Sequence, residues 1–229
     1  DVLALYGPAL PDNAVTFEQL FTSWREACRR QTTATQDDSV LREYLQLALA
    51  AEWPAKVLSE VKADSVVLSR PGVADRVTGL WFPGKGVPVL AVDPGGAEAA
   101  RKQPRVAELL SAKRPVLLID AFQTGSSVTP RNTKVGHFLA FNATDDACRV
   151  QDILTALAWL HSQSSTRPEL AGFDRAAVWT TFAAAVSPVN VKLISDAVNF
   201  SGSDDDFISQ FFVPGIQRAG GIEAATRLT

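Results

Sequence analysis

Short apolar runs alternate with helix-like segments from residue 87 onward, and this alternation restricts the possible folds more than any other feature of the chain. The apolar runs span residues 87–92, 115–119, 170–173 and 191–197, and the helical segments between them span residues 97–113, 144–162 and 176–186. Strands that are apolar along their whole length are typical of a parallel sheet with helices on both faces. The sequence therefore predicts an α/β fold with a doubly wound, mostly parallel sheet.

The part of the chain before residue 87 has a different organisation. Residues 64–70 and 76–82 are strand-like and flank the turn Pro71-Gly72, so we expect them to form an antiparallel pair at the start of the sheet. Thr16 and Gln19 have the spacing of a helix capping box, and apolar residues then recur every three or four positions. We therefore divide the chain into an N-terminal helical extension, residues 1–58, and an α/β domain, residues 59–229.

The composition argues against several classes of partner and cofactor. The net charge is −3, the pI is about 5.4 and no block of lysine and arginine occurs, which argues against nucleic acid and an anionic membrane as partners. No apolar run reaches the length of a membrane span. Cys28 and Cys148 match no metal-ligand spacing, and a glycine-rich nucleotide loop is absent. We therefore expect no metal, no cofactor, and two free, buried thiols.

Two strand ends carry residues that fit a ligand pocket. Ligands of doubly wound sheets bind at the carboxyl ends of the strands. Asp93 follows the first apolar run, and the paired glycines Gly95 and Gly96 would let backbone N–H groups form an oxyanion hole. A plain Pro-Gly turn ahead of a helix fits the same residues. Asp120 and Gly125 follow the next strand, where they either line the pocket or form its loop.

A third strand end has the form of a nucleophile elbow. Gly172-Phe-Asp-Arg-Ala176 stands between a strand and a helix, and the sharp turn of an elbow needs small residues on both sides of the nucleophile. The nucleophile position holds Asp174. We expect Asp174 to have a strained backbone with positive φ and to direct its carboxylate toward Gly95 and Gly96. The alternative is a decayed elbow in which Asp174 is a structural carboxylate, paired with Arg175 or another cation.

The strand order, the glycine loop and the elbow together resemble the α/β-hydrolase fold. Three further stretches resemble bacterial hydrolases of the acetylxylan-esterase and dienelactone-hydrolase type: Val116-Leu-Leu-Ile-Asp-Ala-Phe122, Arg149-Val-Gln-Asp-Ile-Leu-Thr-Ala-Leu-Ala-Trp-Leu160 and Phe211-Phe-Val-Pro-Gly-Ile-Gln-Arg-Ala-Gly-Gly221. The resemblance covers residues 60–229. It implies an esterase-like domain of a larger protein, a small ester or carbohydrate ester as substrate, and a secreted or periplasmic location.

Two departures from that family concern its catalytic residues. The family has serine at the elbow, where this chain has Asp174. Its acid and histidine follow further strands, so we expect the α/β domain to be incomplete at its C-terminus. His137, in a loop downstream of a strand end, is the candidate base, and pinning of that loop is the alternative. His161 is on the apolar side of a helix, where we expect a packed histidine.

These departures favour a degenerate, non-catalytic esterase-like domain within a larger hydrolase, beside a neighbouring domain or in a homo-oligomer. The alternative is an active hydrolase with Asp174 as its nucleophile. Dehalogenases and epoxide hydrolases of this fold use an aspartate to attack carbon, and a histidine-activated water then releases the resulting ester. In either case the pocket residues would be Asp93, Gly95, Gly96, Asp120 and Arg175.

Overall fold

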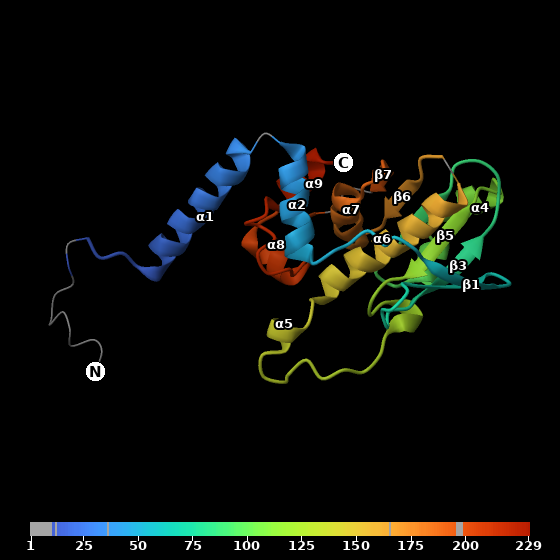
Figure 1. Ribbon diagram of the computed structural model, residues 1–229, viewed down its shortest axis with the longest axis horizontal. Coiled ribbons are helices and arrows are strands. Elements are labelled where there is room, and N and C mark those ends of the chain that lie inside the picture. Colours follow the sequence, from blue (N-terminus) through green and yellow to red (C-terminus); the bar gives the residue numbers. More distant parts are fainter. Residues whose placement is uncertain (1–10, 12, 36, 165, 196–198) are drawn as a thin grey trace.

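The computed structural model describes residues 11, 13–35, 37–164, 166–195 and 199–229. Within these residues the chain forms a seven-stranded sheet with the strand order β1-β2-β3-β5-β4-β6-β7 (Figure 1). The strands are β1 (Leu58–Lys62), β2 (Ser65–Ser69), β3 (Val77–Phe82), β4 (Val89–Val92), β5 (Val116–Asp120), β6 (Glu169–Gly172) and β7 (Lys192–Ser195).

The sheet is mixed, with most strands running in one direction. β1 with β2, β2 with β3, and β3 with β5 pair antiparallel, whereas β5 with β4, β4 with β6, and β6 with β7 pair parallel. β2 and β4 to β7 therefore run together, and β1 and β3 oppose them. The predicted antiparallel pair is confirmed as β2 and β3, and the predicted parallel pairing of the first two apolar runs is confirmed as β4 and β5.

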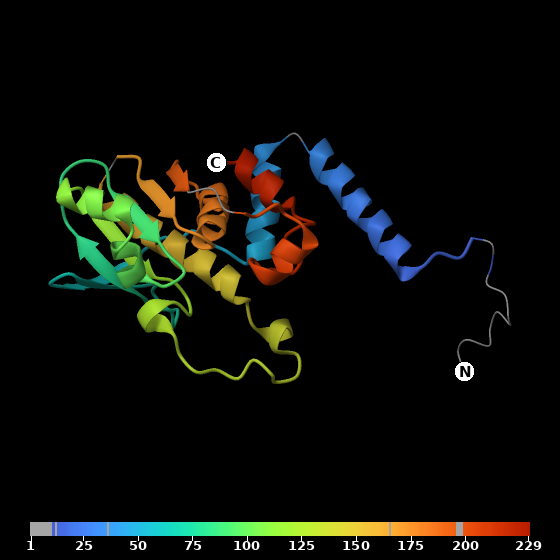
Figure 2. The same ribbon diagram turned by 180° about the vertical axis from the view of Figure 1, so that it is seen from behind.

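Helices cover both faces of the sheet (Figures 1 and 2). α6 and α7 pack on one face and α3 and α4 on the other, while α2 and α9 pack on the outside of α7. The helices are α1 (Phe17–Ala34), α2 (Asp38–Leu49), α3 (Ala97–Arg101), α4 (Pro104–Ser111), η2 (Gly125–Ser127), α5 (Phe138–Phe141), α6 (Asp145–Gln163), α7 (Ala176–Val186), α8 (Asp204–Ser209) and α9 (Gly221–Arg227).

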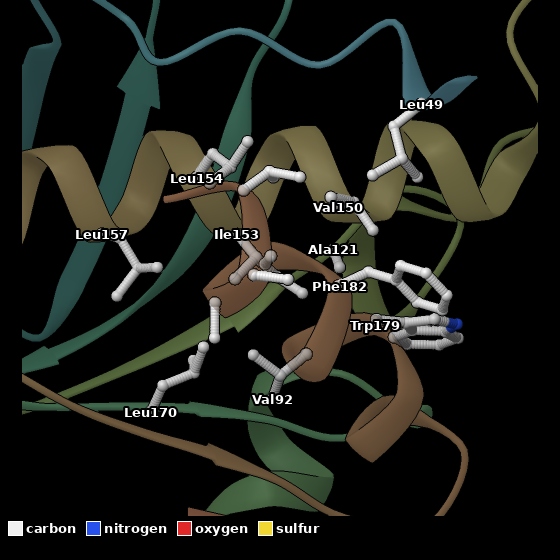
Figure 3. Packing of buried hydrophobic residues seen from close by; sticks show 14 of the residues in the cluster. Leu49, Val92, Ala121, Val150, Ile153, Leu154, Leu157, Leu170, Trp179 and Phe182 are labelled. Carbon is white, nitrogen blue, oxygen red and sulfur yellow. The ribbon is translucent and has the colours of Figure 1, made fainter. Parts of the chain in front are cut away.

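Alternate residues of the central strands feed two separate cores. Leu90 and Val92 of β4 face the larger core under α6 and α7, and Ala91 between them faces the smaller core under α3 and α4. Figure 3 shows the larger core, where Val92 lies among side chains of α6 and α7 such as Ile153 and Phe182. Burial on both faces explains why the central strands are apolar along their whole length.

The N-terminal helices differ in how they meet the rest of the molecule. The capping box at the start of α1 is confirmed, because Thr16 and Gln19 exchange side chain-to-backbone hydrogen bonds. All of α1 is described, and none of its residues is buried. α2 instead buries Leu41, Leu45 and Leu49 in the larger core. The N-terminal region thus holds two helices, and of these only α2 packs an apolar face into the core.

Two sequence predictions about the helices and strands need correction. The single helix expected at 97–113 is two helices, because Pro104 cannot continue a helix and forces Gln103 into an extended conformation (ψ 132°). Leu193 and Ile194, expected to be buried, are partly exposed because β7 pairs on one side with β6 and has no second neighbour among the described strands.

β1 was not predicted, since all of its residues are exposed and it has no apolar pattern. Residues 196 and 197, expected to end the last strand, lie outside the described residues.

Cys28 and Cys148 are free, as expected, but both are only partly buried. Burial raises the pKa of the Cys148 thiol to about 11, and the nearby Asp152 adds to this.

Candidate functional site at the carboxyl edge of the sheet

The carboxyl ends of β4, β5 and β6 meet at one edge of the sheet. Val92 is in register with Ile119 of β5 on one side and with Gly172 of β6 on the other. Asp93, Asp120 and the Phe173–Asp174 turn therefore leave the sheet side by side. The topology brings together the three segments that the sequence singled out as candidates.

The loop after β4 closes on itself. The buried Asp93 accepts hydrogen bonds at Oδ1 from the Gly95 N–H (2.8 Å) and at Oδ2 from Gln103 Nε2 (2.8 Å). The Gly96 N–H donates to the Asp93 carbonyl at 2.9 Å. Both N–H groups considered for an oxyanion hole thus have partners inside the turn. The alternative prediction, a plain turn ahead of a helix, describes this loop.

Asp120 fastens the loop after β4 to the loop after β5. Its Oδ1 accepts from the Ala97 N–H at 2.7 Å, and its Oδ2 accepts from Ser126 Oγ at 2.5 Å. Gly96 and Gly125 both have positive φ, and a Cβ on either would lie 2.3 Å or less from Asp120 Oδ1. The two glycines are therefore needed so that this buried carboxylate can lie between the two loops. Asp120 belongs to the framework of the edge.

The turn after β6 has the backbone of an elbow. Asp174 has φ 47°, the left-handed conformation that the elbow prediction requires. Phe173 still donates a backbone bond to Val92, and within three residues the chain enters α7. The Asp174 side chain is exposed, and no hydrogen bond or ion pair joins its carboxylate to another described residue. The N–H groups toward which we expected it to point already have partners in the Asp93 turn.

Crowding explains the small residues around Asp174. A Cβ on Gly172 would lie 2.2 Å from Thr180 Oγ1 and 2.7 Å from both the Ala176 carbonyl oxygen and the Ala177 Cα. Ala176 and Ala177 are themselves buried. The strand and the helix thus approach as closely as the sequence pattern of small residues predicted.

Arg175 does not pair with Asp174. Its Nε donates to the Gln210 carbonyl at 2.5 Å, and its guanidinium lies 3.4 Å from the carboxylate of Asp146. Asp146 is buried, and it also accepts from Arg149 (2.8 Å) and from the backbone N–H of Phe212 (2.7 Å). Arg175 therefore attaches the elbow to the start of α6 and to the C-terminal segment.

The Asp146 cluster was missed by the sequence reasoning. Arg149 lies over the ring of Trp179, 4.6 Å from its centroid, and Arg175 lies 5.8 Å from the same centroid. The indole N–H of Trp179 is buried and has no partner among the described residues. The only sequence signal was the Asp146–Arg149 spacing on one helix face, because the other members come from distant parts of the chain.

The two histidines lie in different places, and neither contacts Asp174. His137 is exposed and precedes α5 with φ 61°, in the long loop between η2 and α6. His161 is exposed in the last turn of α6, so the prediction of a packed histidine is wrong. Fifteen residues of helix separate it from Asp146, which is about 22 Å at the rise of an α-helix.

A further buried carboxyl lies behind the loop after β5. Burial raises the pKa of Asp152 to about 8, Asp75 adds to this, and a hydrogen bond with the backbone of Phe122 together with Arg70 and Arg149 opposes it. Asp152 is a buried residue of α6.

The structure shows neither a metal cluster nor a membrane helix in the part of the chain that it describes. No group of three or more histidine, cysteine, aspartate or glutamate side chains among those residues could hold a metal ion. None of the described helices combines the length and apolar character needed to cross a bilayer.

Comparison with known proteins gives likeness of fold only. No family model matches the chain. No curated protein matches it either. Among solved structures it is similar to an acetyl xylan esterase from Thermoanaerobacterium, with 14% identity over 82% of this chain and 72% of the esterase at a TM-score of 0.46. It is also similar to an esterase from Pyrococcus furiosus, with 17% identity over 80% of this chain and 65% of the esterase at a TM-score of 0.44.

A third similar structure is a protein of unknown function from Agrobacterium tumefaciens that is assigned to the α/β hydrolases, with 17% identity over 63% of this chain and 65% of that protein at a TM-score of 0.42. The chain spans 45% to 65% of the length of the first solved structures that it matches. These likenesses are to the fold alone. In its fold, with a mostly parallel sheet that starts with antiparallel strands and has helices on both faces, this chain resembles the α/β hydrolases.

Proposed function

We propose that this chain is an esterase-like α/β-hydrolase-fold domain that does not carry out serine-type ester hydrolysis, and that it serves as a non-catalytic part of a larger hydrolase. Acyl transfer by a hydrolase of this fold needs a nucleophile that a base can deprotonate, and N–H groups that are free to bind the oxyanion. The elbow here has a carboxylate in place of a hydroxyl. The N–H groups of Gly95 and Gly96 bond within their own turn.

The observation that carries this proposal is the isolation of Asp174. Its backbone has the elbow conformation, but its exposed carboxylate has no bond to either histidine or to Arg175 among the described residues. Such a group is suited to bind a cationic or hydroxyl-bearing ligand at the edge of the sheet, and an ester or carbohydrate ester is the substrate class that we propose for the larger hydrolase. The neighbouring catalytic unit would then supply the chemistry.

An active hydrolase with Asp174 as nucleophile is the second candidate. The positive φ at Asp174 and its exposed, unbonded carboxylate favour it. In that reaction a carboxylate oxygen forms a bond to carbon, and the leaving halide or epoxide oxygen departs with the bonding electrons. A histidine then takes a proton from a water molecule that attacks the ester carbonyl carbon, the bond from that carbon to the alkyl oxygen breaks, the product leaves as an alcohol, and the carboxylate is regenerated. The histidine would have to come from the loop of His137 or from outside the chain.

Turnover assays on the purified chain separate the two candidates. We expect no turnover of an aryl acetate, a haloacid or an aryl epoxide above the rate of a heat-denatured sample. Haloacid or epoxide turnover that disappears in Asp174→Asn would replace the first proposal by the second. Aryl acetate turnover that disappears in the same variant would contradict the non-catalytic proposal. Asp205→Asn is the matched control, because Asp205 is an exposed aspartate of α8 and not part of the elbow.

A further inference from the structure

α1 has an apolar face that the other described residues leave largely exposed. Phe17, Phe21 and Trp24 recur at helical spacing and are 79%, 50% and 57% exposed. Their rings contact one another, with centroids 6.2 Å apart for the first pair and 5.9 Å for the second. Helices of this length are marginal in water without tertiary contacts on their apolar face. We therefore expect this exposed apolar face to bind another protein surface.

α1 is attached to the body at its C-terminal end and near its middle. Arg227 donates to the Thr35 carbonyl at 3.1 Å and pairs with Asp38 at 2.6 Å, which fixes the C-terminal end of the helix beside α9. Arg25 forms an ion pair with Asp204 at the start of α8. From these contacts the helix runs outward, and its N-terminal half projects beyond the body in both views (Figures 1 and 2).

An open apolar hollow continues the face of α1 onto the C-terminal segment. It has a volume of about 780 Å³ and lies between α1 and residues 201–223. Its walls include Phe21 and Trp24 on one side and Ile208 and Phe212 on the other. Ile208 and Phe212 are 67% and 41% exposed. We call the exposed set Phe17, Phe21, Trp24, Ile208 and Phe212 the arm surface.

The arm surface has about the area that a specific dimer needs. From the 150–250 Å² that a buried aromatic side chain contributes, the exposed parts of its five side chains amount to about 500 Å² per copy. Two copies would bury about 1,000 Å², close to the lower limit of specific protein interfaces. Apolar patches of this size are as large as the largest one on a typical monomer, and such patches are often functional.

We propose that the arm surface is the interface of a two-fold symmetric dimer of this chain, in which the α1 helices of two copies pair antiparallel. In such a dimer the same surface is used by both copies, as two-fold symmetry requires. Charge favours the antiparallel arrangement. Glu18 is in the first turn of α1. Near its other end Arg29 and Arg30 outnumber Glu26, with which Arg30 pairs, so antiparallel helices place opposite net charges together. The helix dipoles favour the same arrangement.

The oligomeric state of the full 229-residue chain tests this proposal. Sedimentation equilibrium over a wide range of concentrations should show a mass that rises to twice the 24.6 kDa of one chain. Trp24→Glu should weaken the association at least about thirtyfold, since buried tryptophans dominate interface energies. Leu47→Glu is the matched control, because Leu47 is a 71% exposed residue of α2 outside the arm surface. It should associate like the unmodified chain.

Either of two results would overturn the proposal: a monomer at every concentration, or a dimer that Trp24→Glu leaves unchanged. Far-ultraviolet circular dichroism shows whether Trp24→Glu keeps its helices, and Phe21→Glu serves as a second variant if it does not. The orientation has its own test. Glu18→Lys should weaken the dimer and adding Arg29→Glu should restore it, whereas no recovery in the double variant would contradict antiparallel pairing.

Discussion

The loops after β4 and β5 differ from the turn after β6 in how they use an aspartate. All three aspartates leave the same edge of the sheet. Asp93 and Asp120 are buried and accept hydrogen bonds from neighbouring N–H and hydroxyl groups. Asp174 is exposed and has no such bond among the described residues, although its backbone has a left-handed φ of 47°. Buried carboxylates persist where they are bonded, whereas the third aspartate contributes little that the fold requires.

This difference between buried and exposed aspartates separates the residues that stabilise the edge from the residue that is available for function. A side chain that the fold uses cannot change freely, because its loss leaves unpaired donors in the interior. A side chain that the fold does not use, in a conformation that costs free energy, is a candidate for binding or chemistry. On that basis Asp174 is the residue to examine for a ligand, and Asp93 and Asp120 are the framework that positions it.

The largest effect that we expect comes from Asp152, a fourth aspartate behind the loop after β5. Its pKa is about 8 in the folded chain, against 3.8 for the unperturbed group, so the folded state keeps a proton that the unfolded state loses. Its contribution to stability is therefore present in full below pH 3.8 and is lost as the pH rises through 8. The slope approaches about 1.4 kcal/mol per pH unit at most.

Urea unfolding at several pH values checks this expectation. Asp152→Asn cannot ionise, so the free energy of unfolding of the unmodified chain should fall relative to the variant between pH 4 and 8. If the difference in unfolding free energy between the two proteins stays constant with pH, Asp152 is ionised in the folded state and is not a buried, protonated carboxyl.

The next effect in size concerns the crowding beside the elbow. Gly172→Ala places a Cβ 2.2 Å from Thr180 Oγ1 and 2.7 Å from backbone atoms of α7, which should cost about 3 kcal/mol of unfolding free energy. Gly136→Ala is the control, because a Cβ there meets no atom within 4 Å. If both substitutions have equally small effects in urea unfolding, β6 and α7 are not in close contact and the elbow geometry is wrong.

The smallest effect concerns the strain at Asp174 itself. Asp174→Gly relieves the left-handed backbone, whereas Asp174→Ala keeps it, and both remove the carboxylate. We expect the glycine variant to be more stable than the alanine variant by about 1 kcal/mol, since a Cβ in this conformation costs roughly that amount. Thermal unfolding of the pair measures the difference. Equal stability would mean that the turn relaxes and that Asp174 stores no strain.

The sequence predicted the sheet better than it predicted the contacts at its edge. Apolar runs without alternation pointed to buried parallel strands, and small residues around Asp174 pointed to a sharp turn, because both patterns are local consequences of packing. The partners of Arg175 could not be predicted in this way, because Asp146 of α6 and Gln210, which follows α8, approach it only through tertiary packing. The exposed β1 and the exposed His161 were missed for the same reason, since exposure depends on where neighbouring elements end.

The paired substitutions Asp120→Asn and Asp174→Asn test most directly whether the edge divides into a framework and one uncommitted carboxylate. Both remove one negative charge with little change in shape, and urea unfolding measures both on the same scale. We expect Asp120→Asn to lose about 2 kcal/mol or more, because two of its bonds come from a buried N–H and a hydroxyl. Asp174→Asn should change stability by less than about 0.5 kcal/mol, as for other exposed surface residues. An Asp174→Asn variant as destabilised as Asp120→Asn would contradict this division, because Asp174 would then be part of the framework.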